Sequence, residues 1–206
     1  MTLAKSEQGS LLELILKHTL KLILAGTIIG VFHRYDLYVA VFLLLYLLYT
    51  LYRKFNANDP EKWIYLIGIG LTSILGIICE KWGIHNQYWS YHNLDNNREF
   101  PYWLPVAWGL AFGYIYRIER EIILIKNIKS IYSKTLLALG IAIFFPTVGE
   151  VVVINLGAWT YHWPLQILGV PILAMFLLMV FHTGINFLLM AICRKFKISD
   201  VVFSAK

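Results

Sequence analysis

Two glutamates within long apolar runs are the residues of this sequence with the clearest capacity for chemistry. Glu80 follows the apolar run 63–79, and Glu150 lies inside the run 135–159, where it is the only charged residue. An acid inside a membrane-spanning helix is costly and usually faces a cavity or a partner. Burial disfavours the charged form of a carboxyl group, and a second carboxyl group nearby disfavours it further. These positions therefore favour a protonated carboxyl that donates a proton.

Both glutamates belong to an internal repeat with an offset of 70 residues. The shared pattern is E-x8-W-x-Y-H-x8-P, and chance would supply about one or two identities over its length. Six of the 22 aligned positions are identical: Glu80/Glu150, Ile84/Ile154, Trp89/Trp159, Tyr91/Tyr161, His92/His162 and Pro101/Pro171. Each copy reads as helix, outer loop and helix from the same side. We therefore expect parallel repeats related by a pseudo-twofold axis along the membrane normal, with both acids at equivalent depths.

Aromatic and polar residues of the repeat are candidates for a binding pocket around the two acids. Tryptophan and tyrosine rings stabilise a cation through their faces. Protonation of an alkene produces such a cation, so the combination suits acid chemistry on a double bond. The candidate pocket residues are Trp89, Tyr91, His92, Trp159, Tyr161, His162, His182 and Asn186. The last two are one turn apart in the final apolar run, and they fit an interhelical polar clamp equally well.

Simpler interpretations of the same residues stay open. Glu80 stands beside Lys81 and could be a solvated residue at a helix end, whereas Glu150 could be a hydrogen-bond acceptor between helices. The tryptophans and tyrosines fit the aromatic belt of any membrane interface. No H-x3-H or H-E-x-x-H pattern occurs, so we expect no metal. Nucleotide, flavin and haem motifs are also lacking, so the chemistry would be cofactor-free.

The composition indicates an integral membrane protein. Of the 206 residues, 59% are hydrophobic and 15% are charged, where a soluble domain carries about 25% charged residues. Mean hydropathy is +0.64. Six apolar runs divide the chain: 20–32, 37–52, 63–79, 101–116, 135–159 and 165–192. The sequence thus predicts an all-α membrane protein with about six transmembrane helices and two parallel helix-loop-helix repeats.

The basic residues predict the topology, because cytoplasmic loops are rich in lysine and arginine. With six spans, one side collects 15 of them: Lys5, Lys17, Lys21, Arg53, Lys54, Lys62, Arg117, Arg120, Lys126, Lys129, Lys134, Arg194, Lys195, Lys197 and Lys206. The other side receives 3: Arg34, Lys81 and Arg98. We expect a multi-pass protein of a bacterial cell membrane with both termini in the cytoplasm. The net charge of +6 comes from basic residues between the apolar runs, where membrane topology explains them. Nucleic acid is therefore not an expected partner.

The expected organisation is one integral membrane domain in five parts. They are a flanking helical pair (1–62), repeat one (63–117), a cytoplasmic interfacial segment (118–134), repeat two (135–193) and a cytoplasmic tail (194–206). The start of the third part mixes isoleucines with charged residues, which is typical of an interfacial helix. A plain extension of the fourth span explains it equally well.

The second repeat resembles a family of membrane-embedded carotenoid biosynthesis proteins. The sequence Glu150-x8-Trp159-x-Tyr161, followed by Gly169-Val170-Pro171, carries the resemblance. The family includes the bisanhydrobacterioruberin hydratases and, more distantly, the heterodimer-type lycopene cyclases. The shared features are an acid in one span, a W-x-aromatic pair at its outer end and a G-x-P opening the next span. The resemblance covers about residues 76–192.

This resemblance implies an intramembrane acid acting on the end group of an isoprenoid lipid. The implied acids are Glu80 and Glu150, and the implied pocket wall is Trp159 and Tyr161. The chain lacks the P-x-E-E motif of lycopene cyclases and has Pro101-Tyr-Trp-Leu and Pro171-Ile-Leu-Ala instead. Hydration or cyclisation of a double bond is the leading functional hypothesis. Its alternatives are a small transporter or lipid-binding protein with an intramembrane acidic site, and a scaffold in which the acids are structural.

Overall fold

The computed structural model describes residues 2–95 and 98–204, with side chains from residue 11 onward. Within this range the chain is mostly helical, as the sequence predicts. The helices are α1 (Thr2–Phe32), α2 (Asp36–Asn56), α3 (Lys62–His85), α4 (Leu104–Lys126), α5 (Ile131–Asn155) and α6 (Ile172–Phe196), with a 3-10 turn η1 (His33–Tyr35). The strands are β1 (Trp89–Tyr91), β2 (Trp159–Tyr161), β3 (Gln166–Ile167) and β4 (Val170–Pro171).

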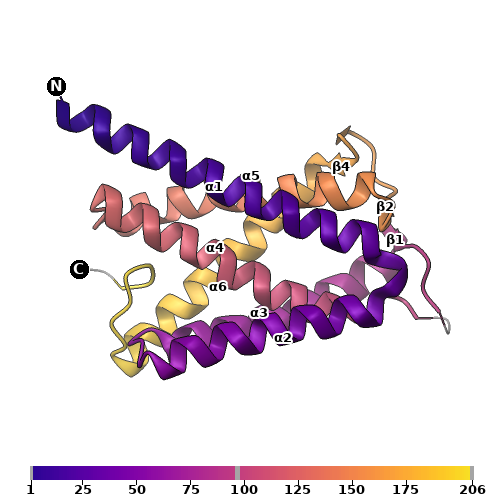
Figure 1. Ribbon diagram of the computed structural model, residues 1–206, viewed down its shortest axis with the longest axis horizontal. Coiled ribbons are helices and arrows are strands. Elements are labelled where there is room, and N and C mark those ends of the chain that lie inside the picture. Colours follow the sequence, from indigo (N-terminus) through magenta and orange to yellow (C-terminus); the bar gives the residue numbers. More distant parts are fainter. Residues whose placement is uncertain (1, 96–97, 205–206) are drawn as a thin grey trace.

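Four helical stretches of the described chain are long and apolar enough to cross a membrane: Leu11–Asn56, Lys62–His85, Ile131–Asn155 and Ile172–Phe196. The first of them, 46 residues long, contains most of α1 and all of α2, and the chain reverses direction between these helices at η1 (Figure 1). α4 is not among the four, and its second half carries Arg117, Glu119, Arg120 and Glu121. The architecture is compatible with a multi-pass membrane protein.

Two helical hairpins form the centre of the molecule, and the first two helices cover them. α3 packs along α4, and α5 packs along α6. α4 also contacts α5, which joins the hairpins. α1 lies along α5, whereas α2 lies against α4 (Figure 1). The helices bury apolar side chains on their inner faces in this way. Many large apolar side chains stay exposed on the outer faces, which is compatible with contact with lipid.

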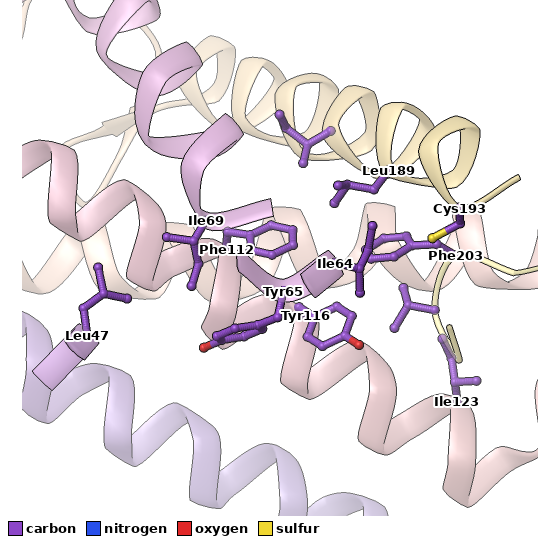
Figure 2. Close-up of a cluster of buried hydrophobic side chains, with 12 residues drawn as sticks. Leu47, Ile64, Tyr65, Ile69, Phe112, Tyr116, Ile123, Leu189, Cys193 and Phe203 are labelled. Atoms are coloured by element: carbon purple, nitrogen blue, oxygen red, sulfur yellow. The ribbon is translucent and has the colours of Figure 1, made fainter. Parts of the chain in front are cut away.

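One end of the bundle is filled by aromatic side chains of α3 and α4 (Figure 2). Tyr116 stacks on Phe112, with ring centroids 5.9 Å apart, and on Phe203, at 5.6 Å. Gly68 of α3 makes room, because a Cβ there would lie 2.1 Å from the ring of Phe112. The core therefore depends on close approach of α3 and α4.

The residues that follow α6 close this same end. Asp200 Oδ2 accepts a hydrogen bond from the hydroxyl of Tyr116 at 2.7 Å, and Lys134 Nζ donates to the carbonyl oxygens of Val201 and Ser204 at 2.7 and 2.8 Å. Burial raises the pKa of the Asp200 carboxyl. We call this end of the bundle, marked by residues 200–204, the tail end.

A short antiparallel ladder marks the opposite end, here called the ladder end. β1 pairs with β2 in the register Trp89↔Tyr161, Ser90↔Thr160 and Tyr91↔Trp159. The sequence predicts loops for these segments, because three residues are too few to display the alternation that identifies a strand. The ladder ties the connection of the α3–α4 hairpin to that of the α5–α6 hairpin.

The structure also revises several predicted boundaries. α5 ends at Asn155, short of the predicted limit at 159, because Gly157 takes a left-handed conformation (φ 85°) that stops the helix. The small β3–β4 hairpin delays the start of α6 to Ile172. α4 continues without a break to Lys126, so residues 118–126 extend the fourth helix instead of forming a separate interfacial helix.

Candidate active site

Both repeat glutamates line one cavity of about 490 Å³ near the ladder end. Its walls are mostly apolar and come from α1, α2, α4 and α5, with Leu178 of α6. Three aromatic candidates from the repeat, Tyr91, Trp159 and Tyr161, line it as well. The structure thus brings together five residues that the sequence selected. The first helical pair, expected to be a flanking support, supplies one side of the cavity.

Glu80 is held by three hydrogen-bond donors. Its Oε2 accepts from Trp89 Nε1 at 2.8 Å and from the Tyr91 hydroxyl at 3.0 Å, and its Oε1 accepts from Trp108 Nε1 at 3.1 Å. The residue is only 7% exposed, so it is not a solvated helix end. With both carboxyl oxygens engaged, Glu80 has the surroundings of a fixed acceptor.

Two glycines of α3 create the space for the donors of Glu80. Gly76 precedes the acid by four residues and Gly83 follows it by three, so both lie on the same face of the helix. A Cβ at Gly76 would lie 2.4 Å from the ring of Trp108, and one at Gly83 would lie 1.8 Å from Trp89. The indoles reach Glu80 because these positions lack a side chain.

Glu150 has a more open environment. Among the described residues its one hydrogen bond comes from the Tyr161 hydroxyl, which donates to Oε2 at 3.1 Å. Val153 and Leu178 occupy the positions 70 residues after Gly83 and Trp108. The valine removes the space for an indole, and the leucine has no proton to donate. Oε1 of Glu150, a residue that lines the cavity, has no hydrogen-bond donor among the described residues.

Glu80 lies close enough to Glu150 to act on its carboxyl group electrostatically. Tyr91 and Tyr161 connect them to the ladder above. Burial raises the pKa of both tyrosine hydroxyls, so both remain protonated and donate their hydrogen bonds. Each acid therefore receives one tyrosine donor from its own repeat.

Aromatic rings surround this end of the cavity. The ring of Tyr91 lies 5.6 Å from that of Trp159 and 6.3 Å from that of Trp103, between centroids. Trp103, directly before α4, and Trp108, one helical turn into it, line the cavity, and the sequence interpretation did not select them. No local sequence pattern indicates a role for these two residues. Trp108, for example, donates to an acid that is 28 residues away. The glycines spaced around Glu80 were the available signal that large side chains approach this face.

The two repeat histidines lie outside the cavity, on the ladder. His92 Nε2 forms a hydrogen bond with Thr160 Oγ1 at 2.9 Å, and His162 Nε2 forms one with Ser90 Oγ at 3.1 Å. Both bonds cross between β1 and β2 and are exposed to solvent. Their placement assigns the histidines to the ladder and not to the pocket.

His182 and Asn186 belong to a separate buried cluster between α4 and α6. Glu119 Oε1 accepts from His182 Nε2 at 2.7 Å, and Asn186 Nδ2 lies 3.2 Å from each oxygen of Glu119. Glu119 is 1% exposed. Neither His182 nor Asn186 lines the cavity, so the structure gives them the geometry of the interhelical clamp. Glu119 was missed because its charged neighbours suggested an interfacial position.

No protein-family model, curated protein or solved structure matches the chain. Among the described residues, no three His, Cys, Asp or Glu side chains are grouped closely enough to hold a metal ion. The case for a function therefore rests on the cavity, its two carboxyl groups and its aromatic rings.

Proposed function

We propose that this protein is a membrane enzyme that needs no cofactor and protonates a double bond at the end of an isoprenoid lipid. The observation that carries the proposal is an apolar cavity whose ladder end holds Glu80, Glu150 and several aromatic rings. A lipid chain fits the apolar walls, and the end of that chain would meet the acids. The resemblance to carotenoid biosynthesis proteins implies the same class of chemistry on the same residues.

Glu150 is the acid in this proposal, because its Oε1 accepts no hydrogen bond from any described residue. Its proton would pass to one carbon of the double bond, whose π electrons form the new C–H bond, and the other carbon becomes a cation. The faces of Tyr91 and Trp159 would stabilise that cation. Water would add to it and return a proton to the Glu150 carboxylate, which gives hydration. A second double bond attacking the cation, followed by the same proton return, would give cyclisation.

The membrane arrangement belongs to the same proposal: six spans, with the ladder end outside and the tail end in the cytoplasm. In this proposal α1 and α2, between which the chain reverses direction at η1, are two separate crossings. α4, which packs against α2, α3 and α5, is a further crossing although it is not one of the four apolar stretches. The connections α2–α3 and α4–α5 lie at the tail end with most of the basic residues, in agreement with the charge rule. Single cysteines at position 95 or 162 should react with an impermeant reagent on intact cells; reaction only after permeabilisation would reverse this orientation.

Parallel repeats are supported by the positions of the elements. α3 ends at His85 and α5 at Asn155, and α4 ends at Lys126 and α6 at Phe196, so both pairs of ends differ by 70 residues. The ladder pairs Ser90 with Thr160, again 70 apart, which is the register that a local twofold axis requires. We propose that this axis relates the two hairpins.

Substitution of Glu150 by glutamine tests the enzyme proposal, since it keeps the shape and removes the proton. Membranes of a host that makes linear isoprenoids should yield a new product with the parent protein, and Glu150→Gln should lower its amount at least about a hundredfold. Glu121→Gln, a change of the same kind away from the cavity, should leave product formation unaltered. Chromatography of the extracted lipids provides the measurement, and full activity of Glu150→Gln would exclude it as the acid.

Lipid binding without chemistry is the second candidate, and the apolar cavity favours it over transport. Transport sites are often built from interrupted helices. α5 continues through Pro146 without interruption, so it lacks that feature. A parent protein that retains bound lipid but converts no isoprenoid would select this candidate.

A further inference from the structure

The two ends of the cavity differ in charge. On α4, Leu104 lines the end near the ladder and Arg117 lines the end near the tail, 13 residues and about 20 Å further along the helix. Lys21 of α1 and Thr50 of α2 line the tail side as well. The cavity is therefore an elongated apolar space with carboxyl groups at one end and two cations at the other.

No described residue compensates the charges of the two cations. Lys21 and Arg117 make no ion pair or hydrogen bond with another described residue. Lys21 lies close enough to His18 to act on it electrostatically, but His18 carries no negative charge that could neutralise the lysine. The acids nearest in sequence to Arg117 are engaged elsewhere. Glu119 binds His182 and Asn186, and Glu121 pairs with His18 at 3.3 Å.

The neighbouring arginine on α4 provides an internal comparison. Arg120 Nε lies 2.7 Å from Oε2 of the buried Glu61, so its charge is neutralised within the protein. Arg117, one turn earlier, has no carboxylate partner of this kind among the described residues. It lies close enough to the hydroxyl groups of Tyr65 and Tyr114 to act on them electrostatically. It is half-buried beside an apolar cavity with its guanidinium unpaired.

We infer that Lys21 and Arg117 bind the phosphate head of a single-chain isoprenoid lipid, whose tail points toward Glu150. Arginine presents a planar set of donors that matches phosphate oxygens, and lysine adds a point charge. The separation of about 20 Å suits a chain that lies along the helices with its two ends in different chemical settings. This inference rests on the proposed function for the role of Glu150 but concerns the other end of the ligand.

Binding of defined lipids to the purified full chain in a nonionic detergent tests the inference. Tryptophan fluorescence, titrated with farnesyl phosphate and with farnesol, gives both affinities. The phosphate should bind at least about tenfold more tightly, and Lys21→Gln or Arg117→Gln should remove most of that preference. Lys17→Gln and Arg53→Gln, which remove charges of the same kind outside the cavity, should preserve it. Lys21 is exposed, so its variant remains informative if Arg117→Gln fails to fold.

Further arms separate the possible outcomes. Equal affinity for farnesol and farnesyl phosphate, or equal effects of cavity and control substitutions, would overturn the head-group site. Phosphatidic acid binding as tightly as farnesyl phosphate would overturn the isoprenoid assignment. Glu150→Gln should bind farnesyl phosphate within about threefold of the parent, because binding needs no proton transfer. The proposed function and the proposed head-group site can therefore be refuted separately, the first by product formation and the second by binding.

Discussion

The surroundings of Glu80 and Glu150 show how one sequence motif can serve two purposes. Three donors hold Glu80, and one donor reaches Glu150. The difference comes from residues outside the motif: Gly83 against Val153, and Trp108 against Leu178. A carboxyl group whose two oxygens both accept hydrogen bonds fixes the packing of its neighbours. A carboxyl group with one oxygen unengaged is available to a ligand. The motif alone marks the place of an acid, and the packing decides its use.

Removal of each carboxyl gives the largest expected contrast. Glu80→Leu leaves three donors without an acceptor. Each buried donor that loses its hydrogen-bond partner costs about 1–3 kcal/mol, so the free energy of unfolding should fall by at least about 3 kcal/mol. Glu150→Leu leaves one donor, the Tyr161 hydroxyl, without an acceptor and should lower the free energy of unfolding by about 1 kcal/mol. Unfolding of the purified proteins in detergent, followed by circular dichroism, measures both. Equal losses would contradict the assignment of different roles.

Closing the space beside Glu80 should have an intermediate effect. In Gly83→Ala the new methyl group would lie 1.8 Å from the Trp89 ring, which must move away from the acid. Overpacking of this kind costs about 1–3 kcal/mol. Gly70→Ala in the same helix is the matched control, because no atom lies within 4 Å of its Cβ position. The control should be neutral or stabilised by up to about 1 kcal/mol. Unfolding midpoints that do not separate the two variants would refute the packing argument.

The smallest effects are expected where the two copies are alike. Ser90→Ala and Thr160→Val each remove one exposed hydroxyl–imidazole bond across the ladder. Each should cost about 0.5 kcal/mol or less, and the two costs should be the same within error. Chemical denaturation of both variants under identical conditions provides the comparison. A large loss in one variant alone would mean that the ladder halves are not equivalent.

The sequence predicts those parts of the molecule that depend on local or repeated patterns. Apolar runs locate the helices, and the offset of 70 locates both acids and their tyrosines. The sequence does not predict Trp108 as a donor to Glu80, since this hydrogen bond joins residues on different helices and leaves no periodic signal. The cluster of Glu119, His182 and Asn186 escapes for the same reason. Long-range pairing of polar side chains is decided by helix packing.

The ladder also bears on how the proposed ligand would reach the cavity. At the ladder end, the backbone N–H of His92 donates to Ala158 O at 3.0 Å, and that of His162 donates to Tyr88 O at 2.8 Å. α1 and α2, by contrast, diverge from η1 toward the tail end (Figure 1). Local opening follows the side with the fewest contacts to break. If the proposed lipid binding holds, the ligand would enter from the bilayer between α1 and α2. Its residence time would then follow the separation of these helices, and its occupancy would follow its mole fraction in the membrane.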